Sequence, residues 1–410
     1  MLKDFKQLMS ARFLFTFAVQ MQAVVLGWRM YDLTHDPLYL GLIGLSEAVP
    51  ALSLALYAGY LVDRSRPLTI YKWVVAVSLV SGLLLFVSQL PQMDLDVHAQ
   101  VVVLFAASFL TGTARAFSQP ALYAVVPRIV PREYLPRTSA WMTSAMQVAR
   151  IAGPAVGGLL FGWTRMAITS GVVCVFLVGS ALTVNLIQAS PPAPAAVSVH
   201  RSPREEFFSG LRFVFRHPIL LPALSLDMIS VLFGGVTALL PIFAAEILMT
   251  GPKGLGALRA APAIGAAITS ILLVRRAIHG RAGDLLFGSV AGFGVCILIF
   301  GVSRNFWVSL IALALSGAFD SVSMVIRTSA VQLSSPDHMR GKISAVNSIF
   351  IGSSNELGEF ESGIAARFLG TVPSVVFGGL LCLATVAGVA FLSPQLRRMD
   401  LRNLETEAGK

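Results

Sequence analysis

Charged residues are scarce in this sequence: 13% of its 410 residues are Asp, Glu, Lys or Arg, whereas 55% are hydrophobic. Soluble domains carry about 25% charged residues, so most of the surface of this chain must face something other than water. A soluble protein would have to bury many separate runs of about 20 apolar residues, which domains of about 150 residues rarely contain. The composition, with a mean hydropathy of +0.75, therefore predicts a polytopic α-helical membrane protein.

Residues that would form a cofactor or catalytic site are also few. Three cysteines, Cys174, Cys296 and Cys382, lie in apolar runs and form no CxxC pair, which argues against a disulfide framework or a zinc site. None of the six histidines lies in the middle of an apolar run, and neither HExxH nor the ATP-binding pattern GxxxxGK[ST] occurs. We therefore expect no enzyme, no cofactor and no metal. A membrane-embedded enzyme or a scaffold is the alternative from another functional class.

The basic residues follow the ends of the apolar runs. The net charge is +10, but no basic arm with interleaved aromatic residues is present, so we expect no nucleic acid partner. Short loops on the cytoplasmic side of membrane proteins are rich in Lys and Arg, which predicts that both termini are cytoplasmic. The loops then assigned to the cytoplasm hold Arg64, Arg66, Lys72, Arg128, Arg132, Arg137, Arg275, Arg276, Arg281, Arg340 and Lys342, and the opposite loops hold Arg165, Lys253, Arg304 and Arg367.

Twelve apolar runs are long enough to be membrane spans. No small-residue cleavage site follows the first run, so we expect it to be retained as a span. The predicted domains are an N-terminal six-helix half (1–187), a cytoplasmic linker (188–217), a C-terminal six-helix half (218–393) and a cytoplasmic tail (394–410). The predicted spans are 11–31, 38–62, 69–89, 99–126, 138–163 and 166–187, then 219–246, 254–274, 283–303, 305–330, 343–368 and 371–393.

The linker has two parts of different character. The run SPPAPAAVSVHRSP cannot bury a core and predicts a flexible connection. The following REEFFSGLRFVFRH interleaves aromatic residues with Arg204, Arg212 and Arg216, which suits a short amphipathic helix on the anionic inner leaflet. An N-terminal extension of the seventh span is the alternative.

An internal repeat relates the two halves. Six spans return the chain to its starting side, so the halves share one orientation and are related by an axis along the membrane normal. The fold class predicted is therefore an all-α membrane protein with twelve transmembrane helices in two pseudo-symmetric halves. A shift of 205 residues pairs Gly112 with Gly317, Arg137 with Lys342, Ser139 with Ser344, Gly153 with Gly358 and Gly158 with Gly363, and a shift of 212 pairs Gly44 with Gly256 and Pro50 with Pro262.

Ionisable residues within the spans are the best candidates for a functional site, because a charge at the bilayer centre costs at least about 2.5 to 3.5 kcal/mol. Glu47 lies about 14 Å into the second span at about 1.5 Å per residue. Its repeat equivalent is Arg259, and the equivalent of Arg115 is Asp320, so each repeat position exchanges one sign of charge for the other. A carboxylate in an apolar site is a possible proton carrier when an arginine can approach or withdraw.

We therefore assign coupling and gating roles, with fixed structural ion pairs as the alternative for each residue. The proton-coupling candidates are Glu47, Asp227, Asp320 and Glu356, and the gating or substrate-binding candidates are Arg115, Arg150 and Arg259. Other ionisable groups in or near the spans are Arg327, Glu359 and Glu361. Trp28, Tyr31, Trp163 and Trp307 lie near span ends, where an interfacial belt is expected.

The loop after the second span carries a recognisable motif. GYLVDRSRP resembles the major facilitator superfamily signature G-x-L-x-D-R-x-G-R, matching at Gly59, Leu61, Asp63 and Arg64, whereas Arg66 replaces the later glycine. The resemblance implies that Gly59, Asp63 and Arg64 belong to a conformational lock. Gly153, Pro154, Gly157 and Gly158, in RIAGPAVGG, look like the antiporter motif of the fifth span in this superfamily, which favours export. Their other interpretation is close helix packing.

A narrower resemblance covers nearly the whole chain. ARFLFTFAVQMQAVVLGWRMYDLTHDPLYLGLIGL, GLGALRAAPAIGA and SSPDHMRGKISAVNSIFIGSSNELGEFESG are similar to the enterobactin exporter branch, near the macrolide efflux proteins. This implies a proton-driven exporter of a siderophore or related amphiphilic molecule in the inner membrane, working by alternating access. Arg115, Asp227 and Asp320 would face a cavity lined by spans 1, 4, 7 and 10. Drug or macrolide efflux and siderophore import are the alternatives.

The expected partners follow from this interpretation. They are a small-molecule substrate, the lipid bilayer and an outer-membrane export channel, and the chain is expected to act as a monomer.

Overall fold

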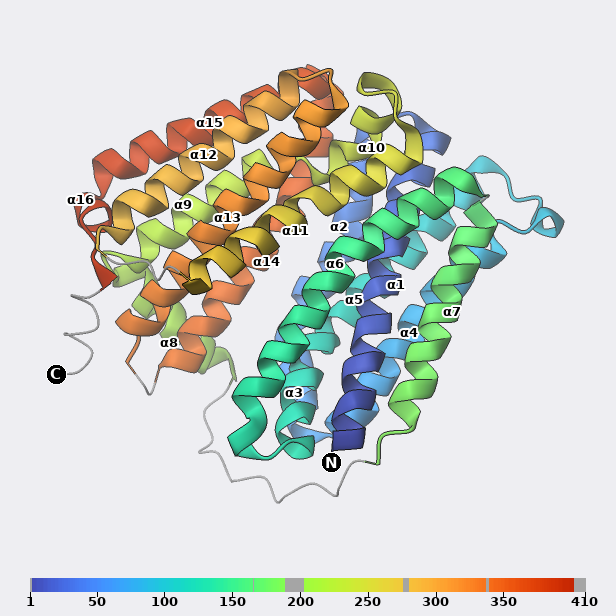
Figure 1. Ribbon diagram of the computed structural model, residues 1–410, viewed down its shortest axis with the longest axis horizontal. Coiled ribbons are helices and arrows are strands. Elements are labelled where there is room, and N and C mark those ends of the chain that lie inside the picture. The colour runs from blue at the N-terminus through green and yellow to red at the C-terminus, as the bar shows by residue number, and fades with distance from the viewer. Residues whose placement is uncertain (1, 165, 189–202, 276–279, 337–338, 402–410) are drawn as a thin grey trace. The chain divides into compact units, whose positions relative to one another are not determined.

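The computed structural model describes residues 2–164, 166–188, 203–275, 280–336 and 339–401, and within these ranges it contains helices and no strand (Figure 1). The helices of the first half are α1 Leu2–Thr34, α2 Pro37–Ser53, α3 Ala55–Arg64, α4 Pro67–Val87, α5 Val97–Ile129, α6 Leu135–Trp163 and α7 Met166–Asn185, with short 3₁₀ turns η1 Pro91–Met93 and η2 Arg132–Tyr134. The later helices are α8 Pro203–Arg216, α9 Leu220–Gly234, η3 Thr237–Leu239, α10 Leu240–Ile242, the π-helix η4 Phe243–Ile247, α11 Gly251–Arg275, α12 Ala282–Val302, α13 Phe306–Ser334, α14 Arg340–Leu369, α15 Thr371–Leu392 and α16 Pro394–Arg397.

Each of the twelve predicted spans coincides with one of these helices or with a consecutive group of them, which confirms the all-α class. Within the described residues, nine segments are long and apolar enough to cross a membrane. The second span falls short because α2 has 17 residues. The equivalent fifth and eleventh spans, α6 and α14, are not among the nine either, and both carry charged residues along their length.

Polar residues at the helix starts explain where the spans begin. The Asp36 carboxylate accepts a hydrogen bond from the Leu38 amide at 2.9 Å, and Asp96 does the same for Ala99 at 3.0 Å. Asn305 accepts from the amides of Trp307 and Val308. These side chains satisfy amide groups that the first helical turn leaves without partners.

Two of the predicted continuous spans are interrupted. The second divides at Leu54 into α2 and α3, and Pro50 lies inside α2 one turn before this division. The seventh ends as a regular helix at Gly234, and Gly235 is extended. The carbonyl of Gly235 accepts a hydrogen bond of 2.6 Å from the Ser362 hydroxyl, so the exposed backbone group is satisfied inside the protein.

The chain forms two compact units. Unit 1 comprises Met1–Val199 and Leu240–Ala260, and unit 2 comprises His200–Leu239 and Ala261–Lys410. In unit 1, α1 packs on α6 and α7, α4 on α5 and α7, and α2 on α5. In unit 2, α9 packs on α14 and α15, and α12 on α13 and α15. The first span of unit 2, α9, thus packs on the fifth and sixth spans of its half, as α1 does in unit 1. The third span, α12 in unit 2 and α4 in unit 1, packs on the fourth and sixth spans in both halves, as a repeat requires.

Two repeat-related glycines allow close approach of neighbouring helices. A Cβ atom placed on Gly112 of α5 would lie 2.0 Å from the Glu47 carbonyl oxygen of α2. A Cβ atom on Gly317 of α13 would lie 2.0 Å from the Pro262 carbonyl oxygen of α11. Only glycine permits backbones to come this close, so the shared glycine reflects the same helix contact in each unit.

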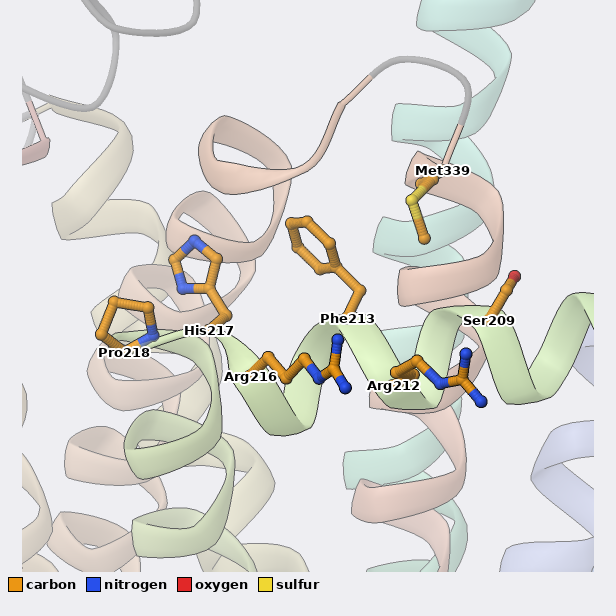
Figure 2. A pocket seen from close by; sticks show the side chains of 7 residues that line it. All are labelled: Ser209, Arg212, Phe213, Arg216, His217, Pro218 and Met339. Atoms are coloured by element: carbon orange, nitrogen blue, oxygen red, sulfur yellow. The ribbon is translucent and has the colours of Figure 1, made fainter.

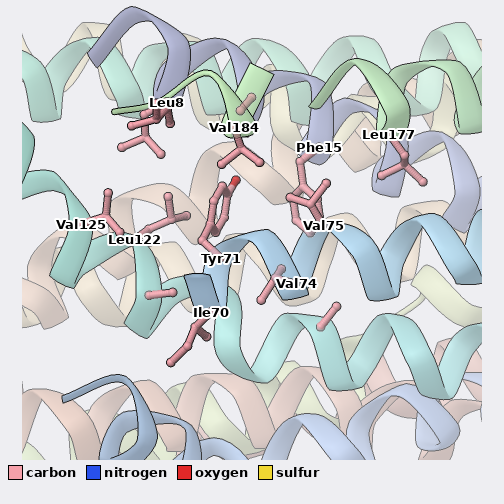
Figure 3. Close-up of a cluster of buried hydrophobic side chains, with 14 of the residues drawn as sticks. Leu8, Phe15, Ile70, Tyr71, Val74, Val75, Leu122, Val125, Leu177 and Val184 are labelled. Atoms are coloured by element: carbon pink, nitrogen blue, oxygen red, sulfur yellow. The ribbon is translucent and has the colours of Figure 1, made fainter. Parts of the chain in front are cut away.

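The interior of unit 1 combines an apolar cluster with a polar one. Tyr71 is fully buried among Leu8, Phe15, Leu122 and Leu177 (Figure 3). Elsewhere in the unit, the amide of Gln22 on α1 donates to the hydroxyls of Ser81 on α4 at 2.9 Å and Thr111 on α5 at 3.0 Å. Because lipid offers no competing partners, such hydrogen bonds help to hold helices together.

The glycine contacts predict a specific loss of stability. Gly112→Ala and Gly317→Ala should each lower the free energy of unfolding by about 1 to 3 kcal/mol, because the new methyl group overlaps a neighbouring backbone. Gly288→Ala on α12 is the matched control, since a Cβ atom there meets nothing within 4 Å. Thermal unfolding of the purified protein in detergent, followed by tryptophan fluorescence, measures the effect. Equal midpoints for all three variants would contradict the close helix contacts.

Candidate functional site

An ion pair lies on unit 1 between two of the predicted site residues. Nη1 of Arg115, near the middle of α5, lies 2.9 Å from Oε1 of Glu47 on α2. The side chains are 44% and 24% exposed, respectively. A charged pair with this much exposure at mid-span is incompatible with contact to lipid tails. This face of unit 1 therefore needs water or polar groups beside it.

Further polar groups extend the same face. Gln119 follows Arg115 by one helical turn, and its side-chain oxygen accepts a hydrogen bond of 3.3 Å from Nη2 of Arg12 on α1. Arg150, near the middle of α6, is exposed and close enough for its charge to act on Arg12. We call the set Arg12, Glu47, Arg115, Gln119 and Arg150 the polar face of unit 1. It holds three guanidinium groups and one carboxylate, so it carries an excess of positive charge.

A buried charge cluster occupies unit 2. Nη1 of Arg327 on α13 forms an ion pair with Oδ2 of Asp227 on α9, and both side chains are less than a tenth exposed. Nε of Arg327 also donates to the Ser323 hydroxyl at 3.3 Å. Asp320, two turns before Arg327 on the same helix, is half-buried and lies within electrostatic range of both members of the pair. One guanidinium thus serves two carboxylates in a low-dielectric interior.

The second half contributes a segment to unit 1. The Tyr31 hydroxyl of α1 donates to Oε1 of Glu246 in η4, and Lys253 of α11 lies over the Trp163 ring at 5.3 Å. Tyr31 was expected in an interfacial belt, but it is buried, because its ring packs in unit 1 and its hydroxyl has a carboxylate partner. The segment Leu240–Ala260 is therefore held on α1 and α6 by polar as well as apolar contacts.

The predicted antiporter-like motif lies in this contact. A Cβ atom on Gly158 of α6 would lie 2.6 Å from the Cα atom of Gly256 on α11, and one on Gly256 would lie 2.6 Å from the Pro154 carbonyl oxygen. Gly153 and Gly157 instead face α1, where added Cβ atoms would crowd Gln20 and Met21. All four motif residues thus serve close helix packing.

The remaining predicted residues are more dispersed. The Arg259 guanidinium lies against Gly27 of α1. Arg64 donates to the Tyr60 hydroxyl one turn earlier, and its guanidinium carbon lies 4.3 Å from the centre of that ring. Gly59 has open space beside it. The side chains of Asp63 and Glu356 lie outside the described residues. Among the residues that are described, no group of three His, Cys, Asp or Glu side chains could hold a metal ion.

Sequence reasoning missed several members of these clusters. Arg12 lies close to the start of its span, where a basic residue is ordinarily interfacial, and Gln119 is uncharged. Their spacing from recognised residues offered a signal, since Gln119 is one turn from Arg115. Arg327 was named without a role, although it lies two turns from Asp320. Glu246 ends its predicted span, and nothing in the sequence indicated its contact with Tyr31.

The buried cluster predicts unequal effects of removing its two charges. Arg327→Met should lower the free energy of unfolding by about 3 to 5 kcal/mol, because it leaves two carboxylates without a cation. Asp227→Asn should lower the free energy of unfolding by less, because Asp320 remains near Arg327. Combining Asp227→Asn with Arg327→Met should restore part of the stability that Arg327→Met alone removes. Steady-state SDS titration of the purified protein measures these values.

The exposed pair is the control for this experiment. Glu47→Gln should cost no more than about 1 kcal/mol, because exposed ion pairs contribute little to stability. Equal losses for Asp227→Asn and Arg327→Met would contradict the sharing of one guanidinium by two carboxylates.

Comparisons with known proteins agree with this architecture. Enterobactin exporters EntS of Shigella boydii serotype 18 and Escherichia coli O81 are 24% and 25% identical over 246 residues, covering 60% of this chain and 58% of each relative. The chain thus matches less than two thirds of the length of these relatives.

Solved structures share the fold at low sequence identity. A POT family transporter bound to a thioalcohol-conjugated peptide superposes with a TM-score of 0.76 at 11% identity, covering 96% of both chains. A bacterial homologue of the iron transporter ferroportin, in an inward-facing state, gives 0.72 at 16% identity, covering 97% of this chain and 100% of the other. A family model described as transmembrane secretion effector matches residues 2–409. The chain belongs to this family of membrane transporters within the major facilitator superfamily.

Proposed function

We propose that this protein exports an anionic, siderophore-like small molecule across the cytoplasmic membrane, driven by the proton gradient. The polar face of unit 1 carries the proposal. Its three guanidinium groups exceed its one carboxylate, so an anionic ligand that reached it would gain charge-assisted hydrogen bonds. Deprotonated catecholate or carboxylate groups have this chemistry, and the enterobactin exporters among the relatives favour a catecholate siderophore.

Substrate would bind through Arg115. This guanidinium lies near the middle of α5 and is partly exposed, with Glu47 accepting one of its hydrogen bonds. Arg150 and Arg12 would contact other anionic groups of the same molecule. Gln119 holds Arg12 in place by accepting its hydrogen bond. Glu47 orients Arg115 when substrate is absent. An anionic group of the substrate would replace the Glu47 carboxylate on Arg115, and Glu47 would then be exposed.

Proton coupling would use the buried cluster of unit 2. Asp227 has Arg327 as its direct partner, whereas among the described residues Asp320 forms no ion pair and is influenced by the more distant charge of the same guanidinium. A proton on Asp320 would balance the cluster, and its release would restore the excess negative charge. Glu47 and Glu356 were also predicted to take part in coupling, and that role stays a prediction for both.

Alternating access would require the segment Leu240–Ala260 to separate from α1 and α6 in each cycle. Its contacts are suited to repeated opening, since a hydrogen bond, a cation–π contact and a glycine pair can each form again without covalent change. If both termini lie in the cytoplasm, as the positive-inside bias of the loops predicts, this segment would be an outer gate. A central cavity lined by spans 1, 4, 7 and 10 and cooperation with an outer-membrane channel remain part of the proposal.

Flux measurements in proteoliposomes test substrate and coupling together. Wild-type protein should move enterobactin faster when a pH gradient is imposed. Arg115→Ala should reduce this flux about tenfold, the loss expected for one charge-assisted hydrogen bond. Asp320→Asn should abolish the dependence on the gradient while leaving downhill flux.

Arg304→Ala, which removes an exposed arginine between α12 and α13, is the control and should transport normally. Gradient-independent flux in wild type would refute proton coupling. Macrolide flux without enterobactin flux would instead favour drug efflux, the alternative within the same superfamily.

Crosslinking tests the gate. A variant carrying Trp163→Cys and Lys253→Cys should lose transport when a short thiol-specific crosslinker joins the two positions, because the segment can then no longer leave α6. Cleavage of a reducible crosslinker should restore flux. Each single substitution is a control, and the native Cys174, Cys296 and Cys382 are buried. Undiminished flux in the crosslinked protein would show that this contact stays closed throughout transport.

A further inference from the structure

A pocket on the surface of unit 2, independent of the proposed transport site, lies beside the last turns of α8. Its volume is about 390 Å³. The walls come mainly from one helix, and α14 contributes a single residue at its start (Figure 2). The lining residues are Ser209, Arg212, Phe213, Arg216, His217, Pro218 and Met339.

The helix presents its basic residues away from the protein. Val214 is fully buried against residues of α9, α13 and α14, and a Cβ atom on Gly210 would lie 2.9 Å from the Lys342 carbonyl oxygen. Arg212 and Arg216, one turn apart, lie on the other side of α8 and are exposed. In Figure 2 their side chains extend on the same side of the helix.

These two arginines lie close enough along α8 for their charges to repel each other. Neither forms an ion pair with any residue that the structure describes. Like charges at this spacing destabilise a helix. Two guanidinium groups in this arrangement can bind the oxygens of one phosphate through paired hydrogen bonds.

His217 adds a neutral donor. Its Nδ1 atom accepts hydrogen bonds of 3.2 Å from the amides of Ile219 and Leu220, where it caps the start of α9. The proton of the neutral ring is therefore on Nε2, which remains able to donate. Burial lowers the pKa of His217 below its ordinary value, so the ring stays neutral at physiological pH. The Phe213 ring lies 5.5 Å from the imidazole and supplies an apolar wall.

The place of the pocket along the chain indicates the layer of the membrane where it lies. The span of α9 begins at Leu220, two residues after Pro218, and the span of α13 ends at Ser334, five residues before Met339. Pocket residues that adjoin the ends of two spans lie at the level of lipid headgroups. Phe215, which is 55% exposed on the flank of α8, can reach the acyl chains below them.

We propose that this pocket binds the headgroup of an anionic phospholipid, with Arg212 and Arg216 on the phosphate and Nε2 of His217 on a further oxygen. The bound lipid would hold α8 at the membrane surface and so fix the point where the chain enters unit 2. The proposal does not depend on which molecule the protein transports.

Lipid titration of the full-length protein in detergent tests it. Dioctanoyl-phosphatidylglycerol should bind to wild type, as counted by native mass spectrometry and by a rise in the thermal midpoint. Arg212→Gln together with Arg216→Gln should weaken this binding about tenfold. Lysine at both positions should weaken it less, because the charge is kept but the paired hydrogen bonds are lost.

The control variant combines Arg304→Gln and Arg398→Gln, which remove two exposed arginines from unit 2 and change the net charge equally. It should bind the lipid as wild type does. Equal weakening in the control, or unchanged binding in the pocket variant, would overturn the assignment. Dioctanoyl-phosphatidylcholine or inorganic phosphate binding as tightly as the anionic lipid would overturn the choice of occupant. Size-exclusion profiles matching wild type confirm that the variants are folded.

Discussion

A charge inside a bilayer must be paired or hydrated, because leaving it in hydrocarbon costs several kcal/mol, and this constraint governs both units. Unit 2 meets it by burial and pairing, with Arg327 held between Asp227 and the charge of Asp320. Unit 1 meets it by exposure, with Arg115 and Glu47 on a face that needs water. The repeat places Arg115 and Asp320 at equivalent positions, so the same location holds a cation in one half and an anion in the other. The halves are alike in architecture and complementary in charge.

Close backbone contact is the second requirement, since lipid tails provide no hydrophobic force that would press apolar helices together. Gly112 and Gly317 permit the same helix pair to touch in each unit. Gly153 and Gly358 likewise lie against the first span of their own half, where added Cβ atoms would crowd Phe17 and Val231. These four repeat-related glycines therefore lie where helix spacing leaves no room for a side chain.

The spans and the repeat were predictable because they depend on local composition and on sequence spacing. The breaks in spans 2 and 7 were not predictable, because Leu54 and Gly235 lie within runs that are apolar on both sides of the break. Depth along a span could be counted from the sequence, so Glu47 and Arg115 were recognised as central charges. Their pairing depends on how each helix is rotated about its axis, and sequence alone does not determine that rotation. Arg12 was missed for a related reason, because its bond to Gln119 arises only when α1 and α5 lie together.

The break at Gly235 has a mechanical consequence. An unbroken helix transmits torque along its whole length, so any twist at one end must strain hydrogen bonds at the other. Gly235, the extended residue after α9, can serve as a hinge. Rotation about its backbone dihedrals leaves the helical hydrogen bonds on either side intact. The chain passes from unit 2 to unit 1 a few residues later, between Leu239 and Leu240. A single span thus supplies residues to both compact units, and within the described residues the Ser362 hydroxyl is the side chain that hydrogen-bonds the backbone at this break.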